Sequence, residues 1–277
     1  MPKSLRTLCI ALTLFVTGTV FAPDVQADPM RSEAVFVQDL KSTKILYDKN
    51  SEDTRPIASI TKLMTALIVA EAGQDLQTEI TINEDDIDRL RNSRSRLAVG
   101  TSLSRDDMLL LALMSSENRA AHALARYYPG GLTAFIRAMN DKARELGMRH
   151  TRFVDPTGLS ANNVSTPRDL IKLIKAVNEN PLVQRYTVNE RHQVKLKNGR
   201  LLTYNNTNRL VKNDSWAVQL SKTGFINEAG RCLVMVTRLD GRDVAMVFLN
   251  SQGRYSRLGD AARVRSYLEK NVDLAML

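Results

Sequence analysis

The chain has 277 residues, a formal net charge of +9 and two cysteines. A hydrophobic content of 43% supports a substantial core, whereas two cysteines are too few for a small extracellular module held together by disulfides. The positive charge favours anionic surroundings.

The first 27 residues have the pattern of a secretory signal peptide. Lys3 and Arg6 form a charged start, residues 8–21 are apolar, and Val25-Gln26-Ala27 offers small residues at the spacing that a signal peptidase recognises. We expect cleavage near Ala27. An uncleaved anchor is the alternative, but the apolar run is shorter than the ~20 residues that span a bilayer. No later run is long enough to form a transmembrane helix.

The expected export decides how the cysteines and the positive charge of the chain are interpreted. Cys9 lies in the predicted signal peptide, so the mature chain keeps only Cys232, which we expect to be buried in the apolar run 232–236. The chain has no nucleic-acid-binding motif, so an anionic polymer of the cell envelope suits the charge better than nucleic acid. We expect a periplasmic protein, soluble or loosely associated with the membrane.

Strand patterns stand at both ends of the mature chain and helix patterns in the middle. Residues 34–40 and 44–47 predict a hairpin, and a helix should run from Ser59 to Ala72. Helices follow at 108–114, 118–127 and 132–146, and another begins at Thr166-Pro167; Asn198-Gly199 predicts a second hairpin, strands are expected at 218–222, 231–238 and 243–249, and a last helix at 258–270.

These patterns predict an α+β fold in which both termini contribute strands to one antiparallel sheet with packed helices. A helical lobe of about residues 76–184 would be inserted into a sheet lobe of about 30–75 and 185–277. Residues 28–277 would thus form a single two-lobed domain. We expect the functional site in the cleft between the lobes.

The first candidate motif is Ser59-Ile60-Thr61-Lys62, whose spacing places Ser59 and Lys62 on one face of a helix. A serine hydroxyl becomes a good nucleophile when a base takes its proton, and a lysine is such a base when burial lowers its pKa. N–H groups of the first helical turn can stabilise a developing oxyanion. Taken alone, the pattern also fits an ordinary serine helix cap.

The second motif is Ser116-Glu117-Asn118, between two predicted helices. Ser116 is a candidate for moving a proton between a lysine and a leaving group, and Asn118 for holding Lys62 and a substrate amide. Both residue types are also common helix caps.

The third motif is Lys222-Thr223-Gly224, at the end of a predicted strand. Lys222 can hold a substrate carboxylate, Thr223 adds a hydroxyl donor, and Gly224 lets a substrate lie against the strand. The structural alternative is a solvated strand end followed by a turn.

Ser-x-x-Lys, Ser-x-Asn and Lys-Thr-Gly in this order are the signature of penicillin-binding proteins and serine β-lactamases. The chain resembles the low-molecular-weight penicillin-binding proteins, the D-alanyl-D-alanine carboxypeptidase and endopeptidase family (peptidase S11), over nearly the whole mature chain. Glu117, where carboxypeptidases commonly have glycine, and the absence of a further domain resemble the penicillin-binding protein 7 type of endopeptidase. The resemblance is carried by residues 56–64, 114–121, 153–160 and 221–225.

The resemblance implies a β-lactamase-like fold and a serine enzyme that acts on peptidoglycan stems and is inhibited covalently by β-lactams, without metal or cofactor. The favoured reaction is D,D-endopeptidase cleavage of D-alanyl-diaminopimelate cross-links, and trimming of pentapeptides by a carboxypeptidase is the alternative. The implied roles are nucleophile for Ser59, base for Lys62, proton relay for Ser116, substrate binding for Asn118, Lys222, Thr223 and Gly224, and an oxyanion hole from the backbone N–H groups of Ser59 and Phe225.

Three rival functions fit less well. A class A β-lactamase uses a loop glutamate to hydrolyse its acyl-enzyme quickly, but residues 155–159 contain no Glu-x-x-Leu-Asn pattern. A His-dependent serine hydrolase or a metalloenzyme would use His122, His150 or His192, but the chain has no Gly-x-Ser-x-Gly motif and no metal-site spacing. We therefore expect structural or surface roles for these histidines. A non-catalytic wall-binding protein would not need every catalytic residue type.

Overall fold

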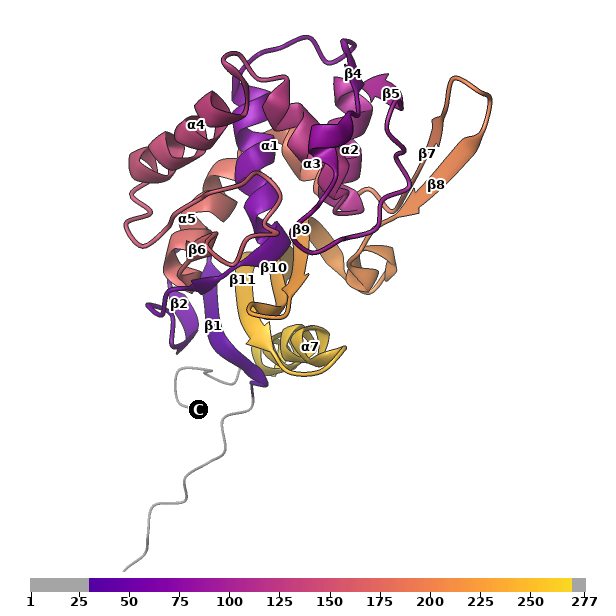
Figure 1. Ribbon diagram of the computed structural model, residues 1–277. Helices are drawn as coiled ribbons and strands as arrows, with labels where there is room; N and C mark the ends of the chain where they lie inside the picture. The colour runs from indigo at the N-terminus through magenta and orange to yellow at the C-terminus, as the bar shows by residue number, and fades with distance from the viewer. Residues whose placement is uncertain (1–29, 271–277) are drawn as a thin grey trace, which may run out of the picture.

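The computed structural model describes residues 30–270, and a five-stranded antiparallel sheet forms its centre (Figure 1). The strand order β2-β1-β11-β10-β9 places the first strands beside the last, because β1 pairs with both β2 and β11. The predicted sheet from both termini is therefore confirmed. Its strands are β1 (Ser32–Asp39), β2 (Ile45–Lys49), β9 (Ala217–Ile226), β10 (Gly230–Leu239) and β11 (Arg242–Ser251).

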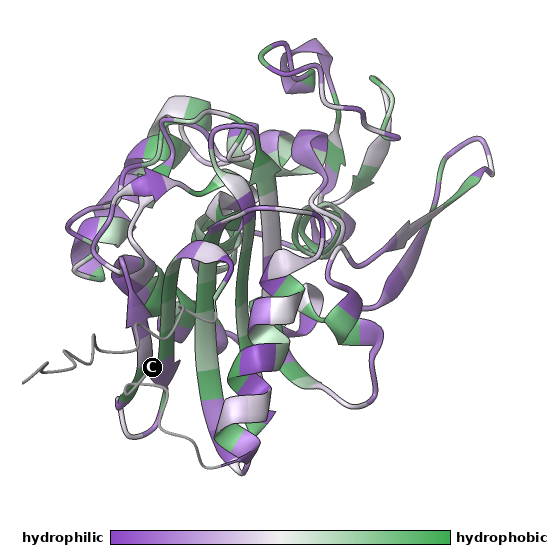
Figure 2. Ribbon diagram, turned by 90° about the horizontal axis from the view of Figure 1, so that it is seen from below, coloured by the Kyte–Doolittle hydropathy of each residue, from purple (hydrophilic) through white to green (hydrophobic). Residues whose placement is uncertain are grey.

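The sheet is covered on both faces, which explains why β10 and β11 are apolar along their length rather than alternating. Along β10, Val234 packs into one core, whereas its neighbours Leu233 and Met235 pack into the other. Figure 2 shows these strands in green, the colour of apolar residues. Cys232 is fully buried and free, as predicted.

Helix α7 (Ser256–Glu269) covers one face of the sheet, and the other helices lie on the opposite side (Figure 1). The predicted start at Thr166 is confirmed, since its side chain accepts the N–H of Asp169, and Ser104 caps α2 in the same way through Asp107. The sequence did not predict α6, which Asn180 caps. The helices are α1 (Lys62–Glu71), α2 (Arg105–Met114), α3 (Asn118–Arg126), α4 (Gly131–Glu145), α5 (Pro167–Asn178) and α6 (Pro181–Thr187).

Short elements complete the fold. The hairpin of β7 and β8 is the one predicted at Asn198-Gly199, and it projects from the molecule in Figure 1. The bounds are β3 (Arg55–Pro56) paired with β6 (Val164–Ser165), β4 (Glu79–Thr81) paired with β5 (Ser102–Ser104), β7 (Arg191–Lys195) paired with β8 (Leu201–Asn205), and the 3-10 turns η1 (Ala58–Thr61), η2 (Glu84–Asp86) and η3 (Arg209–Lys212).

Two predicted boundaries were wrong. The α-helix begins at Lys62, not at Ser59, because a 3-10 turn precedes it and no side chain caps that turn. Lys222-Thr223-Gly224 lies inside β9 rather than at its end, since pairing with β10 continues as far as Ile226 opposite Gly230. Neither difference changes the order of the three motifs or removes one of them from the site.

Two other expectations concern the chain ends and its division. The predicted signal peptide at 1–27 lies outside the described residues. Within residues 30–270, no helix combines the length and apolarity that a membrane crossing requires. The division into a sheet lobe and a helical lobe stays a prediction.

Asp260 on α7 joins the beginning of the described chain to its end. Its fully buried carboxylate accepts the N–H groups of Arg31 (2.9 Å) and Ser32 (2.8 Å) and the Ser32 hydroxyl (2.5 Å). It also pairs with Arg263 at 2.7 Å. A buried carboxylate with four donors fixes where β1 enters the sheet.

Asp260→Asn should lower the free energy of unfolding by roughly 2–4 kcal/mol, because the amide keeps the shape but loses the charge and one acceptor. Urea titration followed by circular dichroism measures the change. The control is Glu269→Gln on the same helix, whose half-exposed carboxylate pairs with Arg265 at 2.7 Å and should matter by less than about 1 kcal/mol. Equal effects of the two changes would contradict this role for Asp260.

Candidate functional site

Ser59 lies in the 3-10 turn η1, and its neighbours fix that turn. Ala58 has φ of +46°, a left-handed conformation that is unfavourable for alanine. The Thr61 hydroxyl donates to the Ala58 carbonyl at 2.8 Å. Gly158 packs directly against this carbonyl, since a Cβ on Gly158 would lie 1.9 Å from the Ala58 oxygen. The strained turn is therefore held from both sides, with Ser59 partly exposed at its surface.

Lys62 reaches Ser59 from the first residue of α1. Its side chain is fully buried, and its Nζ donates to Ser59 Oγ at 3.0 Å, Asn118 Oδ1 at 2.7 Å and the Thr157 carbonyl at 2.6 Å. These three contacts match the three N–H groups of an ammonium. The predicted contacts of Lys62 with Ser59 and Asn118 are thus present.

Burial lowers the pKa of Lys62 from 10.5 to about 7, because the ammonium is removed from water. The nearby carboxylates of Asp155, Glu117 and Asp88 oppose this shift. A neutral amine keeps two N–H groups and one lone pair. Since the oxygens of Asn118 and Thr157 can only accept, the lone pair must face the Ser59 hydroxyl, which can donate. The geometry therefore suits removal of the hydroxyl proton by Lys62.

Lys222 lies on β9 and is also fully buried. Its Nζ donates to Ser116 Oγ at 2.9 Å and to the Thr223 carbonyl at 2.9 Å, which leaves a third N–H free for a ligand. Burial, and then the charge of Lys62, lowers the pKa of Lys222 well below its usual value. Ser116 itself has φ of +61° between α2 and α3, and its lysine partner is Lys222.

Strand β9 is an edge strand, so one row of its backbone groups faces away from β10. Ser221 donates its N–H outside the sheet, to a hydroxyl of α6. By the two-residue period of a strand, the N–H groups of Thr223 and Phe225 face the same way. Gly224 passes close to η1, since a Cβ on it would lie 3.1 Å from the Ser59 nitrogen. The free edge of β9 therefore runs beside Ser59.

The side chains of Thr223 and Phe225, on this edge strand, differ in exposure. The Thr223 hydroxyl donates to Thr207 Oγ1 at 2.7 Å, and the Thr207 N–H in turn bonds the Met114 carbonyl at the end of α2. Phe225 is 53% exposed, and the Arg231 guanidinium lies 4.7 Å from its ring centroid. Phe225 thus offers an apolar surface at the mouth of the site.

The loop 155–160 supplies the Thr157 carbonyl that holds Lys62. The Asp155 carboxylate organises this loop by accepting the N–H groups of Thr157 (2.6 Å), Gly158 (2.7 Å) and Ser160 (3.0 Å) and the Thr157 hydroxyl (2.6 Å). Buried Asn163 ties the loop to η1, because its amide donates to Thr61 Oγ1 at 3.1 Å. Both oxygens of the Asp155 carboxylate therefore accept hydrogen bonds that hold the loop.

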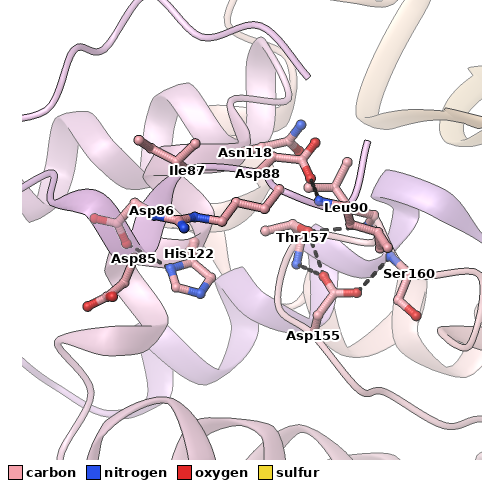
Figure 3. A pocket seen from close by; sticks show the side chains of 12 residues that line it. Asp85, Asp86, Ile87, Asp88, Leu90, Asn118, His122, Asp155, Thr157 and Ser160 are labelled. Carbon is pink, nitrogen blue, oxygen red and sulfur yellow. Dashed lines mark hydrogen bonds and ion pairs between the residues drawn. The ribbon is translucent and has the colours of Figure 1, made fainter. Parts of the chain in front are cut away.

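A pocket of about 190 Å³ adjoins the site (Figure 3). Asn118 and Thr157 line it, so two of the residues that hold Lys62 also form its wall. His122 lines its far side, with Nδ1 2.7 Å from Asp86 Oδ1, and Asp86 also pairs with Arg126 at 2.8 Å. This pairing fits the structural role expected for His122.

The three motifs meet at one place, as the sequence predicted. Lys62 bonds Ser59 and Asn118, and Lys222 separately bonds Ser116. Thr223, Gly224 and Phe225 follow Lys222 along β9, which passes beside Ser59.

Sequence reasoning missed some of the partners. The Thr157 carbonyl has no side-chain signature, because any residue could provide it. Ser93, whose hydroxyl accepts from the Asn118 amide at 2.9 Å, and Thr207 lie in segments without a recognisable motif. Among residues 30–270, no group of three or more His, Cys, Asp or Glu side chains could hold a metal ion.

Comparison with known families gives a match over most of the chain. A family model named peptidase S11 and described as D-alanyl-D-alanine carboxypeptidase matches residues 21–253. A D-alanyl-D-alanine endopeptidase of Escherichia coli is 43% identical, over 97% of this chain and 90% of that protein. A protein of the same name from Pseudomonas aeruginosa is 44% identical, over 96% of this chain and 87% of that protein.

Solved structures share the fold. The crystal structure of the Streptomyces K15 DD-transpeptidase superposes with a TM-score of 0.80 at 28% identity, covering 88% of this chain and 98% of that one. A penicillin-binding protein homologue from Mycobacterium tuberculosis has a TM-score of 0.79 at 22% identity and shows likeness of fold alone. The predicted α+β fold of the β-lactamase and penicillin-binding protein type is confirmed.

Gly158→Ala should destabilise the protein by roughly 2–4 kcal/mol, because the added Cβ meets the Ala58 carbonyl and the φ of +81° is unfavourable for alanine. Thermal unfolding measures the loss. Gly147→Ala is the matched control, with φ of +70° but nothing within 4 Å of the added Cβ, and should cost about 1 kcal/mol. If both variants lose the same stability, the contact with η1 contributes nothing.

Proposed function

Because the chain belongs to the peptidase S11 family, we propose that it is a serine D,D-endopeptidase that cleaves D-alanyl cross-links of bacterial peptidoglycan through an acyl-enzyme on Ser59. The single observation that carries the mechanism is the hydrogen bonding of Lys62. Two fixed acceptors occupy its N–H groups, so the neutral amine presents its lone pair to Ser59.

Substrate binding uses the free edge of β9. An extended peptide can add to this edge as a further strand, which Gly224 permits by having no side chain. The unused N–H of Lys222 would hold the carboxylate next to the scissile bond, and the Thr223 hydroxyl would add a second donor once it turns away from Thr207. The scissile carbonyl would then lie near Ser59.

Acylation begins when Ser59 Oγ attacks the D-alanyl carbonyl carbon and Lys62 Nζ takes the hydroxyl proton. The N–H groups of Ser59 and Phe225 stabilise the oxyanion. As the C–N bond breaks, Ser116 gives its proton to the leaving nitrogen and regains one from Lys222, 2.9 Å away. Water then attacks the ester: its hydroxide adds to the carbonyl carbon and its proton returns to Lys222 through Ser116. As the C–O bond breaks, Lys62 gives its proton back to Ser59 Oγ, which releases the D-alanyl product and restores the starting enzyme.

The location and the choice of bond are part of the proposal. The predicted signal peptide directs the chain to the periplasm, where cross-linked peptidoglycan lies. Glu117 in the second motif and the names of the similar E. coli and P. aeruginosa proteins support the endopeptidase. Carboxypeptidase trimming is the second candidate, supported by the description of the family model.

The test uses purified muropeptides. The protein should cleave cross-linked dimers to monomers, detected by liquid chromatography and mass spectrometry, faster than it removes D-alanine from free pentapeptide. Ser59→Ala should do neither. Release of D-alanine without loss of dimers would assign the carboxypeptidase instead.

Acylation should follow the titration of Lys62. Below pH 7 the ammonium uses its third N–H on Ser59 and cannot act as a base, so the second-order rate of labelling by a fluorescent penicillin should be about tenfold lower at pH 6 than on the plateau above pH 8. Lys62→Gln should lose at least 100-fold at every pH. A rate independent of pH between 5 and 9 would exclude Lys62 as the base.

Penicillin should leave Ser59 slowly. Fast release needs a carboxylate free to activate water, but the only carboxylate of the loop 155–160, Asp155, is already bonded by four donors. The acyl-enzyme should therefore persist for minutes or longer in intact-mass spectra. Rapid turnover of a chromogenic cephalosporin would instead identify a β-lactamase.

A further inference from the structure

A second pocket flanks Ser116. Ser115 and Glu117, the residues on either side of Ser116, contribute to its wall. Arg94, Arg96 and Tyr204 also line it. The mechanism above uses none of these side chains, although two of the lining residues are the chain neighbours of Ser116.

Tyr204 contributes a buried polar group to this pocket. The side chain is only 1% exposed, and its buried hydroxyl has no hydrogen-bond partner among the described residues. An unpaired buried polar group is unfavourable in a free protein, so its presence at a pocket points to a ligand. Burial, with the charge of Glu117 acting in the same direction, raises the pKa of Tyr204 to about 12. The hydroxyl therefore stays protonated and can donate.

Two guanidinium groups add positive charge. The Arg96 guanidinium stacks 3.8 Å from the Tyr204 ring centroid and spends one N–H on the Thr203 carbonyl, at 2.6 Å. Neither Arg94 nor Arg96 forms an ion pair with any described residue. Their remaining N–H groups, with the Tyr204 hydroxyl, suit a carboxylate.

Glu117 adds the opposite kind of group. Its carboxylate accepts the Arg119 N–H at 3.2 Å as the cap of α3 and keeps further accepting capacity. A pocket lined by several donors and one carboxylate fits a peptide carboxyl terminus. The terminal carboxylate would bind the arginines and the hydroxyl, and an amide N–H would reach Glu117.

We propose that this pocket binds a free carboxylate of the peptide stem that leaves when a cross-link is cut. The inference rests on the proposed endopeptidase function. A carboxypeptidase releases one D-alanine, whose only carboxylate is held at Lys222, so no second carboxylate remains for the pocket. An endopeptidase releases a whole stem that carries a second carboxylate. The pocket would therefore select cross-links over pentapeptides.

The test compares Tyr204→Phe and Arg94→Gln with wild type on three substrates. These are a cross-linked muropeptide dimer, the same dimer in which every free carboxylate of the leaving stem is amidated except the one next to the scissile bond, and monomeric pentapeptide. In each variant, kcat/KM for the native dimer should fall about 5- to 20-fold. This fall should exceed the fall in the rates of pentapeptide hydrolysis and penicillin acylation by at least fivefold. Amidation should slow wild type similarly and the variants much less.

Two controls separate binding from structure. Arg200→Gln removes an exposed arginine that does not line this pocket, in the turn between β7 and β8, and should leave dimer cleavage within twofold of wild type. Tyr204→Phe should leave the melting temperature unchanged or raised, because it removes an unpaired buried hydroxyl. A marked loss of stability would mean that the hydroxyl has a structural partner and would overturn the proposal.

The outcomes also separate the inference from the function beneath it. If wild type hydrolyses pentapeptide but not dimers, the endopeptidase assignment fails and the subsite fails with it. If wild type cleaves dimers but neither the variants nor amidation has a selective effect, the endopeptidase stands and the subsite is wrong. An equal loss in Arg200→Gln would trace the effect to general surface charge and would also reject the subsite.

Discussion

The buried amine of Lys62 is the interaction on which the rest of the site depends. A lysine without access to water is unfavourable unless its nitrogen is fully bonded. Here three oxygens from α3, the loop 155–160 and the turn η1 meet that requirement. Because the elements that supply them are far apart in the sequence, most of the fold must be correctly assembled before Lys62 is held against Ser59.

Much of the surrounding structure serves to keep these oxygens in place. Asp155 fixes the loop through backbone N–H groups, and Asn163 links that loop to the turn that carries Ser59. Ala58 and Ser116 both have a left-handed backbone, which is unfavourable for a residue with a side chain. Ala58 directly precedes Ser59, and Ser116 is the first residue of the second motif. The apolar packing around the sheet therefore also offsets the strain of these two turns.

The sequence predicted the motifs, their order and the sheet of both termini, because hydrophobic period and side-chain chemistry are local properties. It placed the start of α1 at Ser59, since a serine before an apolar helix resembles a cap, whereas tertiary contacts of Ala58 and Gly158 impose a 3-10 turn there. It missed the Thr157 carbonyl and the unpaired Tyr204 hydroxyl, because a backbone oxygen and the absence of a partner leave no pattern in the chain.

The pairing of β1 with β11 has a consequence for how the protein comes into being. The strand at residues 32–39 finds its neighbour only when residues 242–251 have been made, and β9, which carries Lys222, reaches the sheet only through β10. Such long-range pairing closes slowly. A growing chain therefore contains Ser59 early but lacks the edge strand beside it until synthesis is almost complete. The topology therefore ties the assembly of this edge to the last part of the chain.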